Sequence, residues 1–167
     1  GADVTVTLVL DNLDVASTSG PAVHVISAGH VSLYVKPGTT NRLSDGASSD
    51  ATIYSTADLT LFGSGTLLID GTSAHGIEGN DDVVIFNANL TIAAVGDGIK
   101  ANDSVVLVDT AVTITAGGDG IQAKHDEDAS KGYVAIIGST IGIKADKDGV
   151  QASSLVLVQA GLVSITA

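Results

Sequence analysis

The 167-residue sequence contains no cysteine, methionine or tryptophan and only two prolines, and aromatic residues make up 3% of it. Without cysteine, the fold cannot depend on disulfides. With so few aromatic residues, the core has to be built from valine, isoleucine, leucine and alanine. This composition is typical of stacked aliphatic columns and less typical of a globular core.

Basic residues are also scarce: 7 Lys and Arg stand against 19 Asp and Glu, giving a formal net charge of −12. So acidic a protein repels nucleic acid and anionic lipid, and we expect neither as a partner. No apolar run reaches about 18 residues, the length that a membrane span needs, so we expect no insertion into a membrane. The charge favours cations as ligands. Because the chain begins with Gly1, we expect that a leader or tag has been removed.

What the sequence does contain is a repeat. Gly76, Gly98 and Gly120 open units that are 22 residues apart, and Gly149 opens the next unit after 29 residues. The longer step predicts one inserted loop near the segment HDEDASK. A fixed period of this length indicates a solenoid, in which each unit buries its apolar face only by stacking on its neighbours.

Within each unit the apolar residues alternate, as in Val83 and Ile85 and, one period later, Val105 and Leu107. A period of two with many β-branched residues indicates strands. The Gly-Ile steps predict a third short strand in each unit. Its inward column comprises Ile53, Ile77, Ile99, Ile121 and Val150, and the next column comprises Ala101, Ala123 and Ala152.

Three short strands per unit predict a right-handed parallel β-helix of about seven coils, forming one domain over residues 1–167. A leucine-rich repeat would need an Asn and Leu consensus that no unit has. The 30-residue step from Val23 to Ile53 predicts another insertion, around Thr39–Asp50, in a loop that carries the sole arginine, Arg42.

Acidic residues share this register. One predicted column precedes the repeated glycines and comprises Asp97, Asp119 and Asp148; a second lies beyond the Gly-Ile strand and comprises Asp81, Asp82, Asp103, Asp126 and Asp128. Carboxylates stacked about 4.8 Å apart repel one another unless a cation lies between them. An all-oxygen ligand set without cysteine favours Ca²⁺ over zinc, copper or Mg²⁺. The structural alternative is that each Asp-Gly pair forms a turn, since aspartate often caps turns through its own side chain.

The run from Asp97 to Ala152, and above all the segment DEDASKGYV within it, resembles the extracellular carbohydrate-binding domains of clostridial type. The upstream segments GPAVHV, TTNRLSDG and HGIEGNDDVVI fit the same pattern, so the resemblance covers nearly the whole chain. It implies a β-helix of pectate-lyase-like shape, bound calcium, secretion to the cell surface or beyond, and binding of acidic plant polysaccharide such as polygalacturonate, and of cellulose. The acidic positions of the family motif fall on Asp97, Asp103, Asp119, Asp126, Asp128 and Asp148.

We therefore expect a calcium-dependent, non-catalytic binder of acidic polysaccharide, with Lys100, Lys124 and Tyr133 as ligand-binding residues. A uronate lyase is the enzyme alternative. It would need a cationic base, and repeated carboxylates suit metal binding better than the asymmetry of acid–base catalysis. A structural alternative is a calcium-stabilised filament, because both terminal strands are apolar and lack polar caps, which predicts head-to-tail association.

Overall fold

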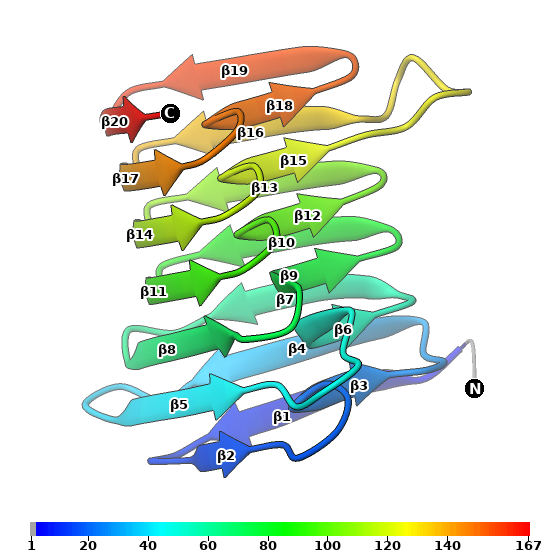
Figure 1. The fold of residues 1–167 in the computed structure, drawn as a ribbon, viewed down its shortest axis with the longest axis vertical. Coiled ribbons are helices and arrows are strands. Elements are labelled where there is room, and N and C mark those ends of the chain that lie inside the picture. Colours follow the sequence, from blue (N-terminus) through cyan, green and yellow to red (C-terminus); the bar gives the residue numbers. More distant parts are fainter. Residues whose placement is uncertain (1–2) are drawn as a thin grey trace.

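The computed structural model describes residues 3–167 as a stack of parallel coils whose strands form three sheets (Figure 1). The described residues form twenty strands and no helix, and therefore no helix that could cross a membrane. Every strand pair between coils is parallel. The prediction of a parallel β-helix of seven coils is confirmed.

The sheets are named A, B and C in the order in which the chain meets them. Sheet A comprises β1 (Thr5–Leu10), β4 (His30–Val35), β7 (Asp58–Phe62), β10 (Asp82–Phe86), β13 (Ser104–Val108), β16 (Tyr133–Ile137) and β19 (Leu155–Gln159). Sheet B comprises β2 (Asp14–Ala16), β5 (Thr40–Ser44), β8 (Thr66–Gly71), β11 (Asn89–Ala94), β14 (Ala111–Ala116), β17 (Thr140–Ala145) and β20 (Leu162–Thr166). Sheet C comprises β3 (Val23–Val25), β6 (Ala51–Ser55), β9 (His75–Gly79), β12 (Ile99–Ala101), β15 (Ile121–Ala123) and β18 (Val150–Ala152).

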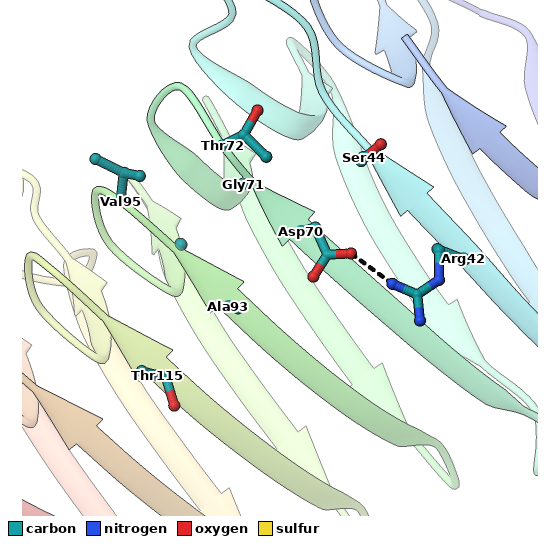
Figure 2. Close-up of a pocket in the computed structure, with 9 residues that line it drawn as sticks. Arg42, Ser44, Asp70, Gly71, Thr72, Ala93, Val95 and Thr115 are labelled. Carbon is teal, nitrogen blue, oxygen red and sulfur yellow. Dashed lines mark hydrogen bonds and ion pairs between the residues drawn. The ribbon is translucent and has the colours of Figure 1, made fainter.

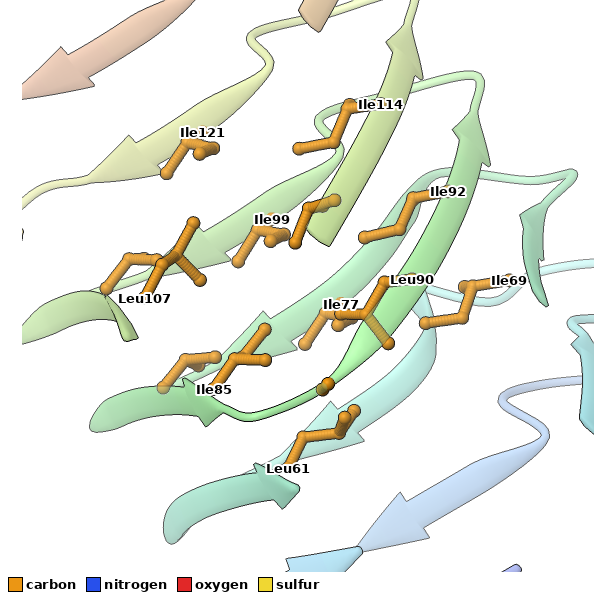
Figure 3. Close-up of a cluster of buried hydrophobic side chains, with 14 of the residues drawn as sticks. Leu61, Ile69, Ile77, Ile85, Leu90, Ile92, Ile99, Leu107, Ile114 and Ile121 are labelled. Atoms are coloured by element: carbon orange, nitrogen blue, oxygen red, sulfur yellow. The ribbon is translucent and has the colours of Figure 1, made fainter. Parts of the chain in front are cut away.

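The core consists of aliphatic columns that run along the stack (Figure 3). The predicted Gly-Ile column is confirmed: Ile53 pairs with Ile77, Ile77 with Ile99, and so on to Val150. Ile77, Ile99 and Ile121 are completely buried. Each inward side chain thus packs on its equivalents one coil away, and removing such surface from water stabilises the stack by about 25 cal/mol per Å².

The glycines that open the repeats are required by close packing between sheets B and C. A Cβ on Gly98 would lie 2.6 Å from the carbonyl oxygen of Gly120 and closer still to Cγ2 of Ile114. Gly76 and Gly120 meet the equivalent atoms of the coil that follows each of them. The 22-residue glycine spacing therefore records a site in each coil where the backbone leaves no room for a side chain.

The corner from sheet A to sheet B repeats a second backbone feature. Asn87, Asp109, Gly138 and Ala160 each adopt a left-handed conformation there, with φ between 49° and 62°. Asparagine, aspartate and glycine enter this region at the lowest cost. The left-handed residue turns the chain sharply, so the connection from β10 to β11 needs only Asn87 and Ala88.

Of the two insertions that the sequence predicted, one is confirmed. The loop between β15 and β16 spans residues 124–132 and contains the segment HDEDASK, as expected. The prediction of one insertion around Thr39–Asp50 is wrong: the turns before β4, β5 and β6 each hold two residues more than their equivalents one coil later. Arg42 accordingly lies in β5 and not in a loop.

We predict that Gly98→Ala lowers the free energy of unfolding by about 1–3 kcal/mol, the usual cost of forcing a methyl group into a packed site. Gly142→Ala is the matched control, because Gly142 also lies within a strand but its Cβ would meet nothing within 4 Å. The control should change stability by no more than about 0.5 kcal/mol in urea unfolding. Equal effects of the two variants would contradict the packing explanation.

Candidate functional site: an aspartate ladder, an acidic cleft and a groove on sheet B

The first predicted acidic column exists, and its carboxylates are bonded to the backbone of the next coil. Oδ1 of Asp97 accepts a hydrogen bond of 2.7 Å from the amide of Asp119. Oδ1 of Asp119 in turn accepts one of 3.0 Å from the amide of Asp148. Both Asp97 and Asp119 are buried, whereas Asp148 is exposed. We call Asp97, Asp119 and Asp148 the aspartate ladder.

Polar side chains of sheet C occupy the other oxygens of the ladder. Gln122 donates to Oδ2 of Asp119 at 2.5 Å, and Gln151 donates to Oδ2 of Asp148 at 2.9 Å. His75 takes the ladder position one coil before Asp97, and its Nδ1 accepts a hydrogen bond of 2.9 Å from the amide of Asp97. Backbone amides and glutamine amides therefore supply the partial positive charge that the stacked carboxylates need.

Lys100, predicted to bind ligand, lies in the same strip of sheet C but is engaged within the protein. Its Nζ donates to Oε1 of Glu78 at 2.7 Å and lies 3.5 Å from Nε2 of His75. Its side chain is 29% exposed. This arrangement leaves Lys100 less open to solvent than Lys124, whose side chain is 58% exposed.

The second acidic column forms a cleft of about 410 Å³ at the turns from sheet C to sheet A. Its walls come from three successive coils, and the inserted loop forms one rim. We call this the acidic cleft, and it is lined by Asn80, Asp81, Asn102, Asp103, Lys124, His125, Asp126, Glu127 and Lys131.

The cleft brings Asp81, Asp103 and Asp126 together with Lys124, but it does not include every predicted residue. Asp82 lies outside it, at the start of β10, where its Oδ1 accepts a hydrogen bond of 2.5 Å from the Ser104 hydroxyl. Tyr133 begins β16 and is not among the lining residues.

Asp128 caps a turn of the inserted loop. Its Oδ1 accepts hydrogen bonds from the hydroxyl and the amide of Ser130, at 2.6 and 2.9 Å. These bonds hold the pKa of the Asp128 carboxyl below its ordinary value, the hydroxyl of Ser130 having the larger effect. Asp128 therefore shapes the rim of the acidic cleft, and its carboxylate already has partners.

Charge inside the acidic cleft is only partly compensated. Lys131 donates to Oδ2 of Asp103 at 2.7 Å, and this bond raises the pKa of Lys131. Nε2 of His125 lies 3.7 Å from Oδ1 of Asp103. Burial, followed by the charges of Asp103 and Asp58, raises the pKa of Asp81 above its ordinary value. Asp81 is thus a carboxylate whose ionised form is disfavoured by its surroundings.

The outer face of sheet B carries a hollow that the sequence did not reveal. It has a volume of about 690 Å³ and is lined by Arg42, Ser44, Asp70, Gly71, Thr72, Ala93, Ala94, Val95 and Thr115 (Figure 2). Nη1 of Arg42 donates to Oδ2 of Asp70 at 2.8 Å across β5 and β8. No sequence motif marks this site, because small outward-facing residues on a strand are common and do not by themselves indicate a function.

Three aromatic residues stack in a ladder on sheet A, which the sequence did not predict. The rings of Tyr34 and Phe62 stack with centroids 5.0 Å apart, and those of Phe62 and Phe86 with centroids 5.2 Å apart. Both faces of Phe62 are therefore covered by its neighbours. Since sugars stack on the faces of aromatic rings, this ladder offers a poor platform for one, and polar sites become the better candidates for ligand binding.

A family model described as "Carbohydrate-binding domain-containing protein" matches residues 1–167, which is the whole chain. The chain belongs to this family. The resemblance noted in the sequence is thereby confirmed at the level of the family, and the polar sites described above are candidate sites of a carbohydrate-binding domain.

Two further comparisons show which known proteins the chain is similar to. A "Carbohydrate-binding domain-containing protein" from Acetivibrio thermocellus is 40% identical over an alignment of 160 residues, which covers 90% of this chain and 56% of the relative. The chain therefore spans little more than half the length of that relative. A solved structure of a polysaccharide lyase-like protein from C. thermocellum, a gadolinium derivative, superposes with a TM-score of 0.90 at 27% identity, covering 99% of this chain and 80% of that one.

We predict that Asp97→Ala destabilises the carbohydrate-binding domain by about 1–3 kcal/mol, because the buried amide of Asp119 loses its acceptor. Asp97→Asn keeps an oxygen in place and should cost less than half as much. Urea unfolding with chelator present measures both. An Asn variant as unstable as the Ala variant would show that charge, and not the hydrogen bond, is what the ladder requires.

We predict that Asp81→Asn stabilises the domain at neutral pH by less than about 1 kcal/mol, since the site is partly exposed and screened. The folded-state pKa of Asp81 is raised, so the wild type gains stability as the pH falls from that pKa to the ordinary value. The advantage of the variant should therefore disappear in acid. Melting temperatures between pH 7 and pH 3 test this, with Asp146→Asn, an exposed acid elsewhere, as the control.

Proposed function

We propose that this carbohydrate-binding domain binds an acidic polysaccharide of the polygalacturonate type through calcium, outside the cell, without catalysing a reaction on it. The observation that carries the proposal is the acidic cleft, where Asp81 and Asp103 from successive coils face one cavity. Membership of the carbohydrate-binding family supports the glycan. The cation and the acidic nature of the glycan are inferred from charge.

Charge explains why a cation is needed. The protein has a net charge of −12, and a polymer of uronic acids is also negative, so direct contact is repulsive. A divalent cation shared between carboxylates of the protein and of the polymer removes this repulsion. Asp81, whose pKa is raised first by burial and then by the charges of Asp103 and Asp58, would gain from that compensation.

The donor types in the acidic cleft fit a hard cation. Carboxylates of Asp81, Asp103 and Asp126 and side-chain amides of Asn80 and Asn102 supply oxygens, which calcium prefers at six to eight positions. Within residues 3–167 no three acidic or histidine side chains already converge on one point. Side chains of the cleft would therefore have to move toward the ion, with Lys131 leaving Asp103, and we expect a weak site with a Kd of about 10⁻⁴–10⁻³ M.

The structural neighbour is a gadolinium derivative, and gadolinium, like calcium, is a hard cation that takes oxygen ligands, so a protein of this fold takes up such a cation. Bound calcium would supply a Lewis-acidic bridge to uronate carboxylates. Lys124, exposed on the rim of the acidic cleft, is placed to add a direct ion pair to the polymer. The aspartate ladder is a less suitable place, since its oxygens are already bonded to amides.

Two features favour binding over catalysis. A uronate lyase needs a cationic base beside its metal, yet Arg42 is paired with Asp70 on sheet B and does not line the acidic cleft. Lysines do line the cleft, but the matching family is described by carbohydrate binding and not by an activity. The lyase-like fold of the structural neighbour does not by itself carry an activity.

Head-to-tail association of copies stays a prediction. The edge strand β19 exposes Leu155, Val156 and Leu157, and the opposite edge strand β1 exposes Leu8 and Val9. Unpaired strand edges with apolar side chains favour pairing with further strands.

The test is binding to polygalacturonate in affinity electrophoresis. We expect the wild type to be retarded with millimolar calcium and released by EDTA, with circular dichroism showing that the fold survives the chelator. Asp103→Asn should weaken the calcium-dependent binding about tenfold or more. Asp50→Asn, which removes one exposed charge away from the acidic cleft, is the control and should bind normally.

Retention of polygalacturonate by a folded protein in EDTA would contradict the calcium bridge. Turnover of polygalacturonate, detected as new unsaturated ends by ultraviolet absorbance, would contradict the non-catalytic part of the proposal.

A further inference from the structure

The outer face of sheet B holds two adjoining hollows. The first, of about 690 Å³, contains Ala93 of β11 and Thr115 of β14. The second, of about 400 Å³, contains Thr91 and Thr113, which are the preceding outward residues of the same strands. Since alternate residues of a strand share one face, the two hollows adjoin on the outer face of sheet B, and we call them together the sheet-B groove.

The floor of this sheet-B groove is made of small side chains. Thr91 pairs with Thr113, Thr113 with Gly142, and Ala93 with Thr115. A flat floor of this kind lets a rigid ring approach the sheet closely and offers both methyl groups and hydroxyls. Volumes of about 300–1,000 Å³ are usual for sites that bind small molecules or single residues of a polymer.

One end of the groove carries a donor and an acceptor side by side. The guanidinium of Arg42 has a single hydrogen bond within residues 3–167, the one to Asp70, and a guanidinium has five N–H donors. The two side chains are 51% and 37% exposed. So exposed an ion pair contributes only about 0–1 kcal/mol to folding, and most of its hydrogen-bonding capacity remains open to a ligand.

The chemistry of the Arg42–Asp70 pair suits a ligand with neighbouring hydroxyl groups. Adjacent hydroxyls of a sugar ring each can donate and accept, so one can donate to Asp70 while its neighbour accepts from Arg42. Hydrogen bonds to charged groups are about twice as strong as neutral ones. A carboxylate would be attracted by Arg42 but repelled by Asp70, which makes the pair a poor site for a uronate group.

We propose that the sheet-B groove is a second, calcium-independent glycan site, in which Arg42 and Asp70 bind adjacent hydroxyls of a pyranose ring that lies on Ala93 and Thr115. The inference shares with the proposed function only that the chain binds glycan. It does not require the acidic cleft or a cation, and it recognises ring hydroxyls where the cleft recognises carboxylates.

Fully methyl-esterified polygalacturonate separates the two sites, because it keeps the ring hydroxyls and has no ionised carboxylates. We expect the wild type to bind it in EDTA, and Arg42→Gln and Asp70→Asn each to weaken that binding at least tenfold. Both variants should keep calcium-dependent binding of polygalacturonate within about threefold, since neither residue lines the acidic cleft.

Two further variants control for structure. Ala93→Phe, at an exposed position that lines the first hollow beside Asp70, should block the proposed ring site. Lys36→Gln removes another exposed ion pair, the one between Lys36 and Asp11 at 2.6 Å, and should bind the esterified polymer like the wild type.

Failure of the wild type to bind the esterified polymer in EDTA would overturn the inference, as would unchanged binding by both Arg42→Gln and Asp70→Asn. Either result leaves the calcium-dependent proposal standing. Conversely, loss of calcium dependence with an intact Arg42 effect would overturn the proposed function and leave the second site in place.

Discussion

Parallel hydrogen bonding between successive coils sets every other feature of this protein. Because Ile77 pairs with Ile99 and Ile99 with Ile121, any residue type that recurs at the repeat period becomes a column in space. Aliphatic residues then form the core, aromatic residues stack on sheet A, and aspartates lie one above another. The same register that is favourable for isoleucine is costly for carboxylates, which have to find positive charge close by.

The two acidic columns meet that demand differently. In the aspartate ladder, Asp97 and Asp119 are bonded to main-chain amides, so the charge is compensated by the fold itself. In the acidic cleft, Asp81 has acidic neighbours, and the charge of Lys131, which is bonded to Asp103, compensates it in part. One column therefore contributes to the architecture, and the other leaves charge available for a ligand.

The sequence was a good guide to everything that repeats. The spacing of Gly76, Gly98 and Gly120 predicted the coils, and the loop before Tyr133 was evident from one long step. It was a poor guide to Arg42, because six additional residues are divided over three turns and leave no single insertion to recognise.

The partners of the carboxylates were also hidden from sequence reasoning. Backbone amides are present at every residue, so nothing in the repeat shows that Asp97 reaches the amide of Asp119. Likewise, the sheet-B groove depends on what Ala93 and Gly142 lack, and small side chains carry no periodic signal of their own.

The loop of residues 124–132 leaves the stack after β15 and returns at β16 without shifting the pairing of either strand. Its length and composition are thus uncoupled from the core, while five of its residues form a wall of the acidic cleft: Lys124, His125, Asp126, Glu127 and Lys131. Under the proposed function, exchange of this one segment would change glycan preference while the coils that carry it stay the same, much as antigen-binding loops diversify on a constant framework.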